Sequence, residues 1–288
     1  MMVSIGAMMH SEHSETAIAA TDATTMLGRT REHAPWQPLR SRHHRLVWQL
    51  LVWLWFMSLS PASWAAIEYV SDSSAGNSNN QSTLTVSRPA GVQSGDLLLA
   101  QISWRGSRNL SAVPTGWTLR QLQLNGTTIR QAVYSKLATS IEPTSYTWQF
   151  SGSGRNAGGI SAWRGVDSSD PVLSSAGNSN SSSTLAAPSL TVSTTNTVAV
   201  ALFANAYGNT NINTNAALTN LYSLATTAGS NGLAVAAGWR AEPTAGTLGP
   251  YYASASANYS YVASTIILKP AATVTLTCLP DDFNRSQL

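Results

Sequence analysis

The chain has 288 residues, of which only 10% are charged, and its formal net charge is +3 at neutral pH. From Ala66 onward eleven Lys and Arg residues stand against nine Asp and Glu, so the basic clusters belong to the N-terminal segment. Because no basic stripe remains to neutralise phosphates, the composition argues against a nucleic-acid partner.

The N-terminal segment predicts export. Residues 1–39 carry no hydrophobic pattern and are expected to be a disordered extension, or the product of a start codon assigned too far upstream. Residues 40–65 predict a signal peptide helix, because the basic flank RSRHHR precedes the apolar run LVWQLLVWLWFMSLS and the small residues Ser63 and Ala65. The alternative is a retained membrane anchor, but the run is shorter than the roughly 20 residues of a spanning helix. Contact with a membrane is therefore expected only through the export signal.

Export has chemical consequences, because all five histidines precede the expected cleavage site after Ala65. An exported chain without histidine excludes a Ser-His-Asp triad, a zinc site with histidine ligands and a histidine general base. Cys278 is the single cysteine and cannot form an internal disulfide.

The segment from residue 66 to residue 270 predicts about ten short strands separated by polar turns. Alternating or fully apolar runs mark these strands, and Asn125-Gly126 predicts a type I′ hairpin turn between two of them. The clearest runs are STLTVS (82–87), GDLLLAQISW (95–104), SYTWQFS (145–151), GGISAWRGV (158–166), TVAVALFA (197–204), GLAVAAGWR (232–240) and YSYVASTIILKP (259–270). Many short strands without helical intervals predict an all-β fold, an antiparallel and jelly-roll-like β-sandwich.

An internal repeat organises these strands into two pseudo-repeat halves. SSAGNSN occurs at 73–79 and again at 174–180, and the same offset of 101 residues brings LLLAQI onto VAVALF. Both polar heptapeptides are expected to be exposed loops at equivalent sites. The halves could be two small sandwiches or two parts of one larger sandwich, and the small, Ala-rich second half favours one domain over 66–270. Residues 271–288 predict a linker and the truncated start of a further domain.

Four motifs in order suggest a family. SGDLLLAQIS, PTGWTLRQ, EPTSYTWQFS and AWRGVDSSDP resemble a β-sandwich module of large exported bacterial proteins and phage-associated surface proteins. The terminal CLPDDFNRSQL is similar to the opening of a laminin-G or concanavalin-like domain. Together the two pieces resemble the N-terminal part of the secreted biogenesis proteins of the mannose-sensitive haemagglutinin (type IV) pilus. This resemblance implies the Gram-negative envelope and a role in pilus-linked attachment.

Exposed aromatic residues are the first candidates for ligand binding, because sugar-binding sandwiches use such rings together with hydrogen-bonding side chains. Trp163 is out of phase with Ile160 and Ala162, and Tyr259 and Tyr261 are out of phase with the buried positions that follow them. These three residues are expected to project from the outer face, with packing in a second layer as the alternative. Trp148 and Trp117 are expected in the core.

The sparse carboxylates argue against metal and catalytic sites. Asp167 and Asp170 could ligate calcium, the one cofactor considered, but two carboxylates are an incomplete set and an Asp before Pro is an ordinary turn signal. Glu142 and Glu242 each precede a proline at equivalent positions, which indicates a shared turn in place of a catalytic pair. No catalytic residue is predicted.

The resulting hypothesis is a non-enzymatic exported module for attachment or assembly at the periplasm, cell surface or extracellular space. Its expected partner is a glycan or a pilus or surface protein. A purely structural spacer, with every tryptophan buried, is the alternative, and a glycan hydrolase is the third possibility.

Overall fold

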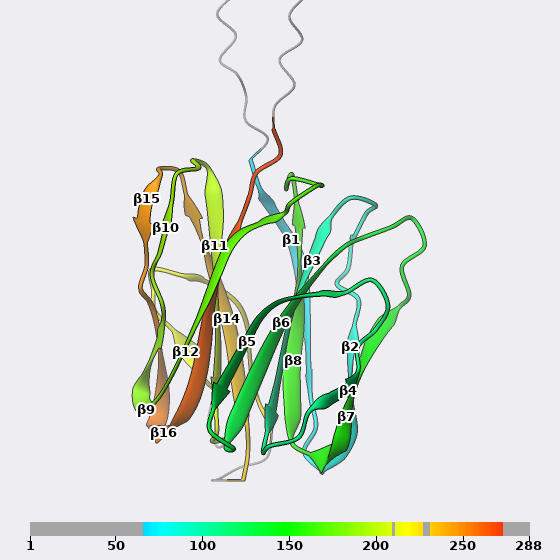
Figure 1. The fold of residues 1–288 in the computed structure, drawn as a ribbon, viewed down its shortest axis with the longest axis vertical. Helices are drawn as coiled ribbons and strands as arrows, with labels where there is room; N and C mark the ends of the chain where they lie inside the picture. The colour runs from blue at the N-terminus through cyan, green and yellow to red at the C-terminus, as the bar shows by residue number, and fades with distance from the viewer. Residues whose placement is uncertain (1–65, 209–210, 227–230, 273–288) are drawn as a thin grey trace, which may run out of the picture. The chain divides into compact units, whose positions relative to one another are not determined.

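The computed structural model describes residues 66–208, 211–226 and 231–272, and every regular element in these ranges is a β-strand (Figure 1). The predicted all-β, antiparallel sandwich with two repeat halves is confirmed. Within the same ranges, no helix is long and apolar enough to cross a membrane. The predicted extension (1–39), signal peptide (40–65) and most of the C-terminal linker (271–288) lie outside the described residues.

The first half contains an inner sheet and an outer sheet. The inner sheet has the order β1-β8-β3-β6-β5 and the outer sheet the order β2-β7-β4. The strands are β1 (Glu68–Gly76), β2 (Gln81–Ser87), β3 (Leu97–Arg105), β4 (Leu110–Ala112), β5 (Thr118–Asn125), β6 (Ile129–Leu137), β7 (Ser145–Gly154) and β8 (Asn156–Arg164).

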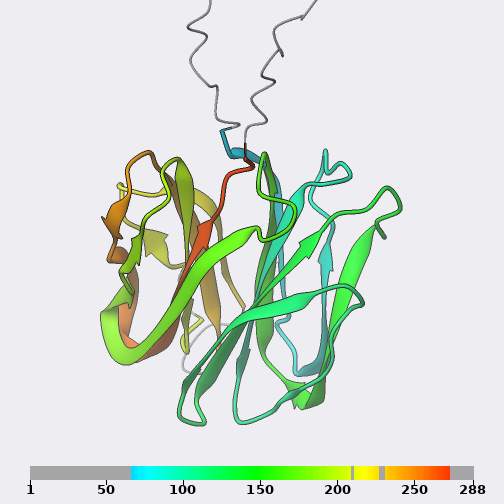
Figure 2. The same ribbon diagram turned by 45° about the horizontal axis from the view of Figure 1, so that its top comes forward.

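The second half repeats this plan, except that two long strands each take the place of two separate strands of the first half. Its strands are β9 (Val172–Ala187), β10 (Leu190–Val192), β11 (Thr197–Asn205), β12 (Asn213–Thr214), β13 (Thr219–Ala225), β14 (Ala234–Glu242), β15 (Gly246–Leu248) and β16 (Tyr251–Leu268). Strand β9 pairs with both ends of β16, whereas in the first half the separate strands β1 and β2 pair with β8 and β7. Both long strands bend, so they contribute to the inner sheet and to the outer layer (Figures 1 and 2). Strands β10 and β15 pair with each other and extend that outer layer.

The register confirms that the two halves are structural repeats. Leu84 pairs with Trp148 and Val86 with Tyr146 in the first half. Leu185 and Ala187, 101 residues after Leu84 and Val86, pair with Ala253 and Tyr251, which lie 105 residues after Trp148 and Tyr146. A β-bulge interrupts the β5–β6 ladder after Leu119, and a bulge interrupts the β13–β14 ladder after Asn220.

Three buried clusters separate the four layers. One lies inside each half, between its inner sheet and its outer layer. The third lies between the two inner sheets and combines side chains such as Leu97 and Leu99 of β3 with Val200 of β11 and Ile266 of β16. Each fully buried aliphatic side chain contributes about 1.5–3 kcal/mol relative to exposure, so this shared cluster holds the halves together.

Strand β3 shows how the layers follow from the sequence. It lies in the centre of the inner sheet, and its residues Leu97 and Leu99 face the second half while Leu98 and Ala100 face the outer sheet. A strand that is covered on both faces needs apolar residues at consecutive positions, as the run LLLA provides. In β7 only one face is covered, and Tyr146, Trp148 and Phe150 alternate with exposed residues. The predicted burial of Trp148 and Trp117 is confirmed.

Two local expectations need correction. The SSAGNSN segments are not both exposed loops: residues 77–79 of the first copy do follow β1 outside any strand, but Ser73–Gly76 belongs to β1 and the whole second copy lies inside β9, where both pair with neighbouring strands. Small polar residues are tolerated there because these strands lie at the edge of the packed layers and are only partly buried. The predicted hairpin exists, but Asn125 ends β5 and only Gly126 has a positive φ, so the turn is not type I′.

Candidate functional site

The structure places Trp163 inside the molecule, which corrects the expectation that it projects into solvent. Its side chain is fully buried in the cluster between the two halves. It packs edge-on against Tyr69 and Trp239, with ring centroids 5.5 Å apart in each pair. Trp163 does point to the opposite face from Ile160, as its phase predicts, but the second half of the chain covers that face. It is therefore a core residue that joins the halves and is not available to a ligand.

Tyr261 and Tyr259 differ from each other in exposure. Tyr261 is 2% exposed in the core of the second half, so its expected projection into solvent was also wrong. The outer layer covers its face of β16. Tyr259 is half-buried and stacks on Tyr207 with a centroid distance of 4.4 Å, so one face of its ring is already occupied. The structure does not bring the three predicted residues together into one site.

The loop containing Asp167 and Asp170 has the geometry of a turn. Asp167 Oδ1 accepts hydrogen bonds from the Ser169 amide and hydroxyl and from the Asp170 amide, and its Oδ2 lies 2.8 Å from Lys269 Nζ. The ammonium group of Lys269, followed by the hydrogen bonds from Ser169, holds the pKa of Asp167 well below its ordinary value. Because the turn and Lys269 occupy this carboxylate, Asp167 has a structural role here. Among the described residues, no group of three or more His, Cys, Asp or Glu side chains is arranged to hold a metal ion.

A buried Glu–Tyr pair occurs once in each half. Tyr146 donates a hydrogen bond to Glu142 over 2.5 Å, and Tyr251 donates one to Glu242 over 2.8 Å. Burial raises the pKa of Glu142, but hydrogen bonds from Lys136, Tyr146 and Thr139 outweigh that effect and lower it to about 2. Burial and the hydrogen bond to Glu242 raise the pKa of Tyr251 above its ordinary value. The two glutamates thus fix the turns in which each precedes a proline.

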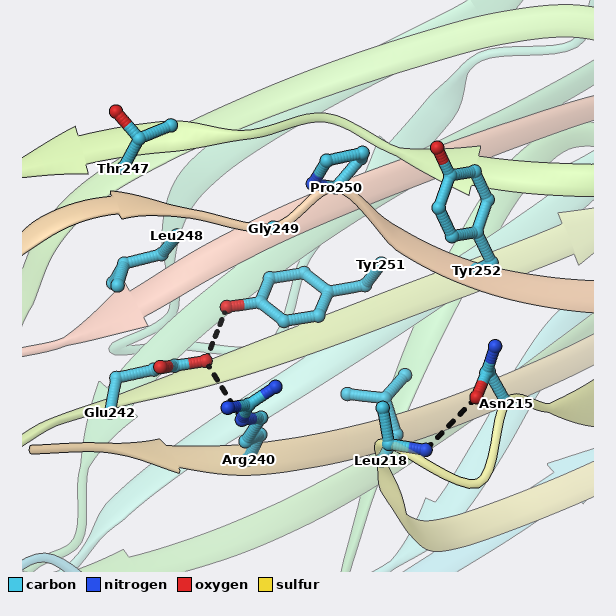
Figure 3. Close-up of a pocket in the computed structure, with 11 residues that line it drawn as sticks. Asn215, Leu218, Arg240, Glu242, Thr247, Leu248, Gly249, Pro250, Tyr251 and Tyr252 are labelled. Carbon is cyan, nitrogen blue, oxygen red and sulfur yellow. Dashed lines mark hydrogen bonds and ion pairs between the residues drawn. The ribbon is translucent and has the colours of Figure 1, made fainter.

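A hollow of about 240 Å³ opens beside the second of these pairs (Figure 3). Its walls come from the end of β14, the connection from β15 to β16 and the turn before β13. Tyr251 and Arg240 point toward Glu242, whereas the ring of Tyr252 points away from it (Figure 3). Tyr252 is 41% exposed and is the most exposed aromatic ring of the described residues. The lining also includes Asn215, Leu218 and Thr247.

The hollow has a physical origin in the repeat. Ala253 occupies the strand position that Trp148 occupies in the first half, and Leu218 corresponds to Trp117 at the offset of 101 residues. In the first half the two indoles pack edge-on with centroids 5.4 Å apart and fill the space between the layers. Of these two smaller side chains, Leu218 lines the hollow, whereas Ala253 is packed in the core of the second half.

The chemistry of the hollow suits an uncharged, hydrogen-bonding ligand. Tyr252 offers an aromatic face at the rim, and Arg240, whose side chain is 54% exposed, offers guanidinium donors. Thr247 and Asn215 add a hydroxyl and an amide. Glu242 Oε1 is held by Tyr251 and by Arg240 Nε at 3.4 Å, so the charges in the hollow are balanced.

The sequence analysis missed Tyr252, although a signal was present. Tyr251 and Tyr252 are adjacent in a strand, and adjacent strand residues point to opposite faces. One of the two rings must therefore face outward wherever one face of the strand is exposed. No family model, characterised protein or solved structure was found to match this chain.

Proposed function

We propose that this chain is an exported, non-enzymatic surface module for attachment, and that the hollow beside Tyr252 binds a glycan. The observation that carries the proposal is an exposed tyrosine ring that lines one hollow together with Arg240, Asn215 and Thr247. Sugar rings stack their C–H faces on such rings, and their hydroxyls take hydrogen bonds from neighbouring polar groups. The signal peptide expected at 40–65 supports export, and the resemblance to pilus biogenesis proteins supports a role at the Gram-negative surface.

The carboxylates support a binding role over hydrolysis. Glycoside hydrolysis ordinarily uses two carboxyl groups that face the same bond. Glu242 is the one carboxylate among the described residues that line the hollow, and it already accepts a hydrogen bond from Tyr251 and forms an ion pair with Arg240. Hydrolysis in this hollow would therefore need a second carboxyl group from a residue that does not line it.

A structural spacer is the second candidate, and one observation favours it. Four of the five tryptophans in the described part, Trp104, Trp117, Trp148 and Trp163, are buried, and Trp239 is partly buried against the shared cluster. A spacer predicts this arrangement, since it has no need for exposed indoles. The two candidate functions differ in the role of Tyr252: the glycan proposal needs its ring for binding, whereas a spacer does not.

A glycan array distinguishes the two candidate functions. It is probed with the full chain and with its Tyr252→Ala and Tyr259→Ala variants. The glycan proposal expects the wild type and Tyr259→Ala to bind the same glycans and Tyr252→Ala to lose them. Tyr259 is a matched control, because it is also a tyrosine of β16 but stacks on Tyr207 away from the hollow. A folded wild type that binds no glycan would overturn the proposal in favour of the spacer.

A further inference from the structure

A second, larger hollow of about 780 Å³ lies at the end of the first half. Its walls are formed mainly by three turns of the first half. One follows β3, one joins β5 to β6, and one joins β7 to β8. Arg105 bonds the carbonyl of Ala206, directly after β11, whereas Glu242 of the first hollow pairs with Thr197 at the start of β11. The two hollows therefore lie toward opposite ends of the same strand.

Three arginines line this hollow, and two of them are held in place by backbone carbonyls. Arg108 donates to the carbonyls of Gly152 and Arg155 and to the side chain of Asn156, over 2.8 to 3.2 Å. Arg105 donates to the carbonyls of Ala206 and Gly232 in the second half. These contacts fix the guanidinium groups in position, but carbonyl groups do not neutralise their charge.

Arg155 is placed differently. Its Nη1 atom is buried and has no hydrogen-bond partner. A buried donor without a partner costs free energy, so it marks a position where an acceptor is missing. Arg155 lies in the turn between β7 and β8 and lines the same hollow as Arg105 and Arg108.

The charge of the hollow is also uncompensated. Among its described lining residues there is no carboxylate, while hydroxyl groups of Ser107, Thr128 and Ser153 lie along the walls. The ion pairs of the described part involve Lys136, Arg164, Arg240 and Lys269, which lie elsewhere. Burial lowers the pKa of Arg105 and of Arg108, as expected where no anion offsets the desolvation of the charge.

We infer that this arginine hollow binds an oxyanion, the carboxylate or sulfate group of an acidic polysaccharide, with Arg155 as its principal donor. Guanidinium groups match the planar geometry of carboxylates and the oxygens of sulfates, and the hydroxyl-lined walls suit the neighbouring sugar hydroxyls. Sequence-tolerant nucleic-acid sites add aromatic rings on which bases stack, and none is among the described residues lining this hollow. The inference does not depend on the Tyr252 hollow.

The test measures binding of the full chain to polygalacturonate, dextran sulfate, neutral dextran, inorganic sulfate and single-stranded DNA. We expect the two acidic polysaccharides to bind, neutral dextran not to bind, and inorganic sulfate to compete only weakly. The Arg155→Gln variant should weaken polysaccharide binding by about tenfold or more, as expected for the loss of one charged hydrogen bond. The side chain of Arg155 makes no hydrogen bond in the structure, so this variant should unfold at the wild-type temperature.

The Arg120→Gln variant is the matched control, because it removes the same charge from a residue of β5 that lines neither hollow. It should keep full affinity for the acidic polysaccharides. Equal losses in both variants would show a general charge effect and overturn the site. Tight binding of inorganic sulfate alone, or DNA binding as tight as that of the polysaccharides with the same dependence on Arg155, would overturn the assignment of the ligand.

Discussion

Gln101 of β3 donates a hydrogen bond from its side-chain amide to the backbone carbonyl of Phe203 in β11, over 2.8 Å and across 102 residues of sequence. Tyr222 of the second half donates to Gln101 Oε1 over 2.9 Å, and Gln101 also bonds Gln131 of β6. Gln131 in turn donates to the hydroxyl of Ser264. A polar network thus crosses the apolar contact between the two inner sheets and fixes how the halves are aligned.

Substitutions in this network should destabilise the protein to different degrees. Tyr222→Phe removes one donor and should lower the free energy of unfolding by about 1 kcal/mol. Gln101→Leu leaves Tyr222, Gln131 and the Phe203 carbonyl with unmet hydrogen bonds in the interior, and should cost about 3 kcal/mol. Urea unfolding followed by tryptophan fluorescence measures both losses. A Gln101→Leu variant as stable as Tyr222→Phe would show that the network does not align the halves.

The shared cluster predicts that both halves unfold together. Trp163 of the first half packs against Trp239 of the second, so removing its ring should weaken both halves at once. We expect one calorimetric transition for the wild type and one for Trp163→Ala, with the variant less stable by about 3–5 kcal/mol. Two separate transitions in the wild type would mean that the halves fold independently.

The depressed pKa of Glu142 predicts a loss of stability in acid. Its pKa is about 2 in the folded chain and 4.5 ordinarily, so the folded state holds the proton less tightly. The resulting stabilisation is present above pH 4.5 and disappears as the pH falls toward 2. Glu142→Gln should be less stable at neutral pH by about 2 kcal/mol, after solvent screening, and should lose less stability between those pH values.

Chemical unfolding at a series of pH values checks this expectation. The exposed carboxylate of Glu68, at the start of β1, provides the control Glu68→Gln. That variant should follow the wild-type acid curve. If Glu142→Gln follows it too, then the contacts of Glu142 with Lys136 and Tyr146 do not stabilise the fold.

Much of the fold could be predicted from local sequence patterns. The alternation in 145–151 and the doubly apolar run at 97–100 correctly indicate one-sided and two-sided burial, and the offset of 101 residues identifies the repeat. The phase of Trp163 also gives the correct side of its sheet. What that phase cannot give is the second layer on that side, because the layer is formed by residues about 100 positions away.

The candidate site was harder to predict for a related reason. Tyr252 is exposed because it alternates with the buried residues Tyr251 and Ala253 in β16, and the hollow beside it is lined by Leu218 where the first half has Trp117. That difference creates a hollow only once the two outer layers are built. The arginine hollow likewise combines turns that are separated in sequence, such as those at Arg105 and Arg155.

The most direct test of the glycan proposal is a calorimetric titration of the full chain with the tightest-binding glycan from the array. The account predicts that Tyr252→Phe, which keeps the aromatic face, binds within about twofold of wild type, and that Tyr252→Ala binds about tenfold more weakly. Both variants should unfold at the wild-type temperature, because the ring of Tyr252 lies at the surface. An unchanged affinity in Tyr252→Ala would contradict the account and remove this hollow as the binding site.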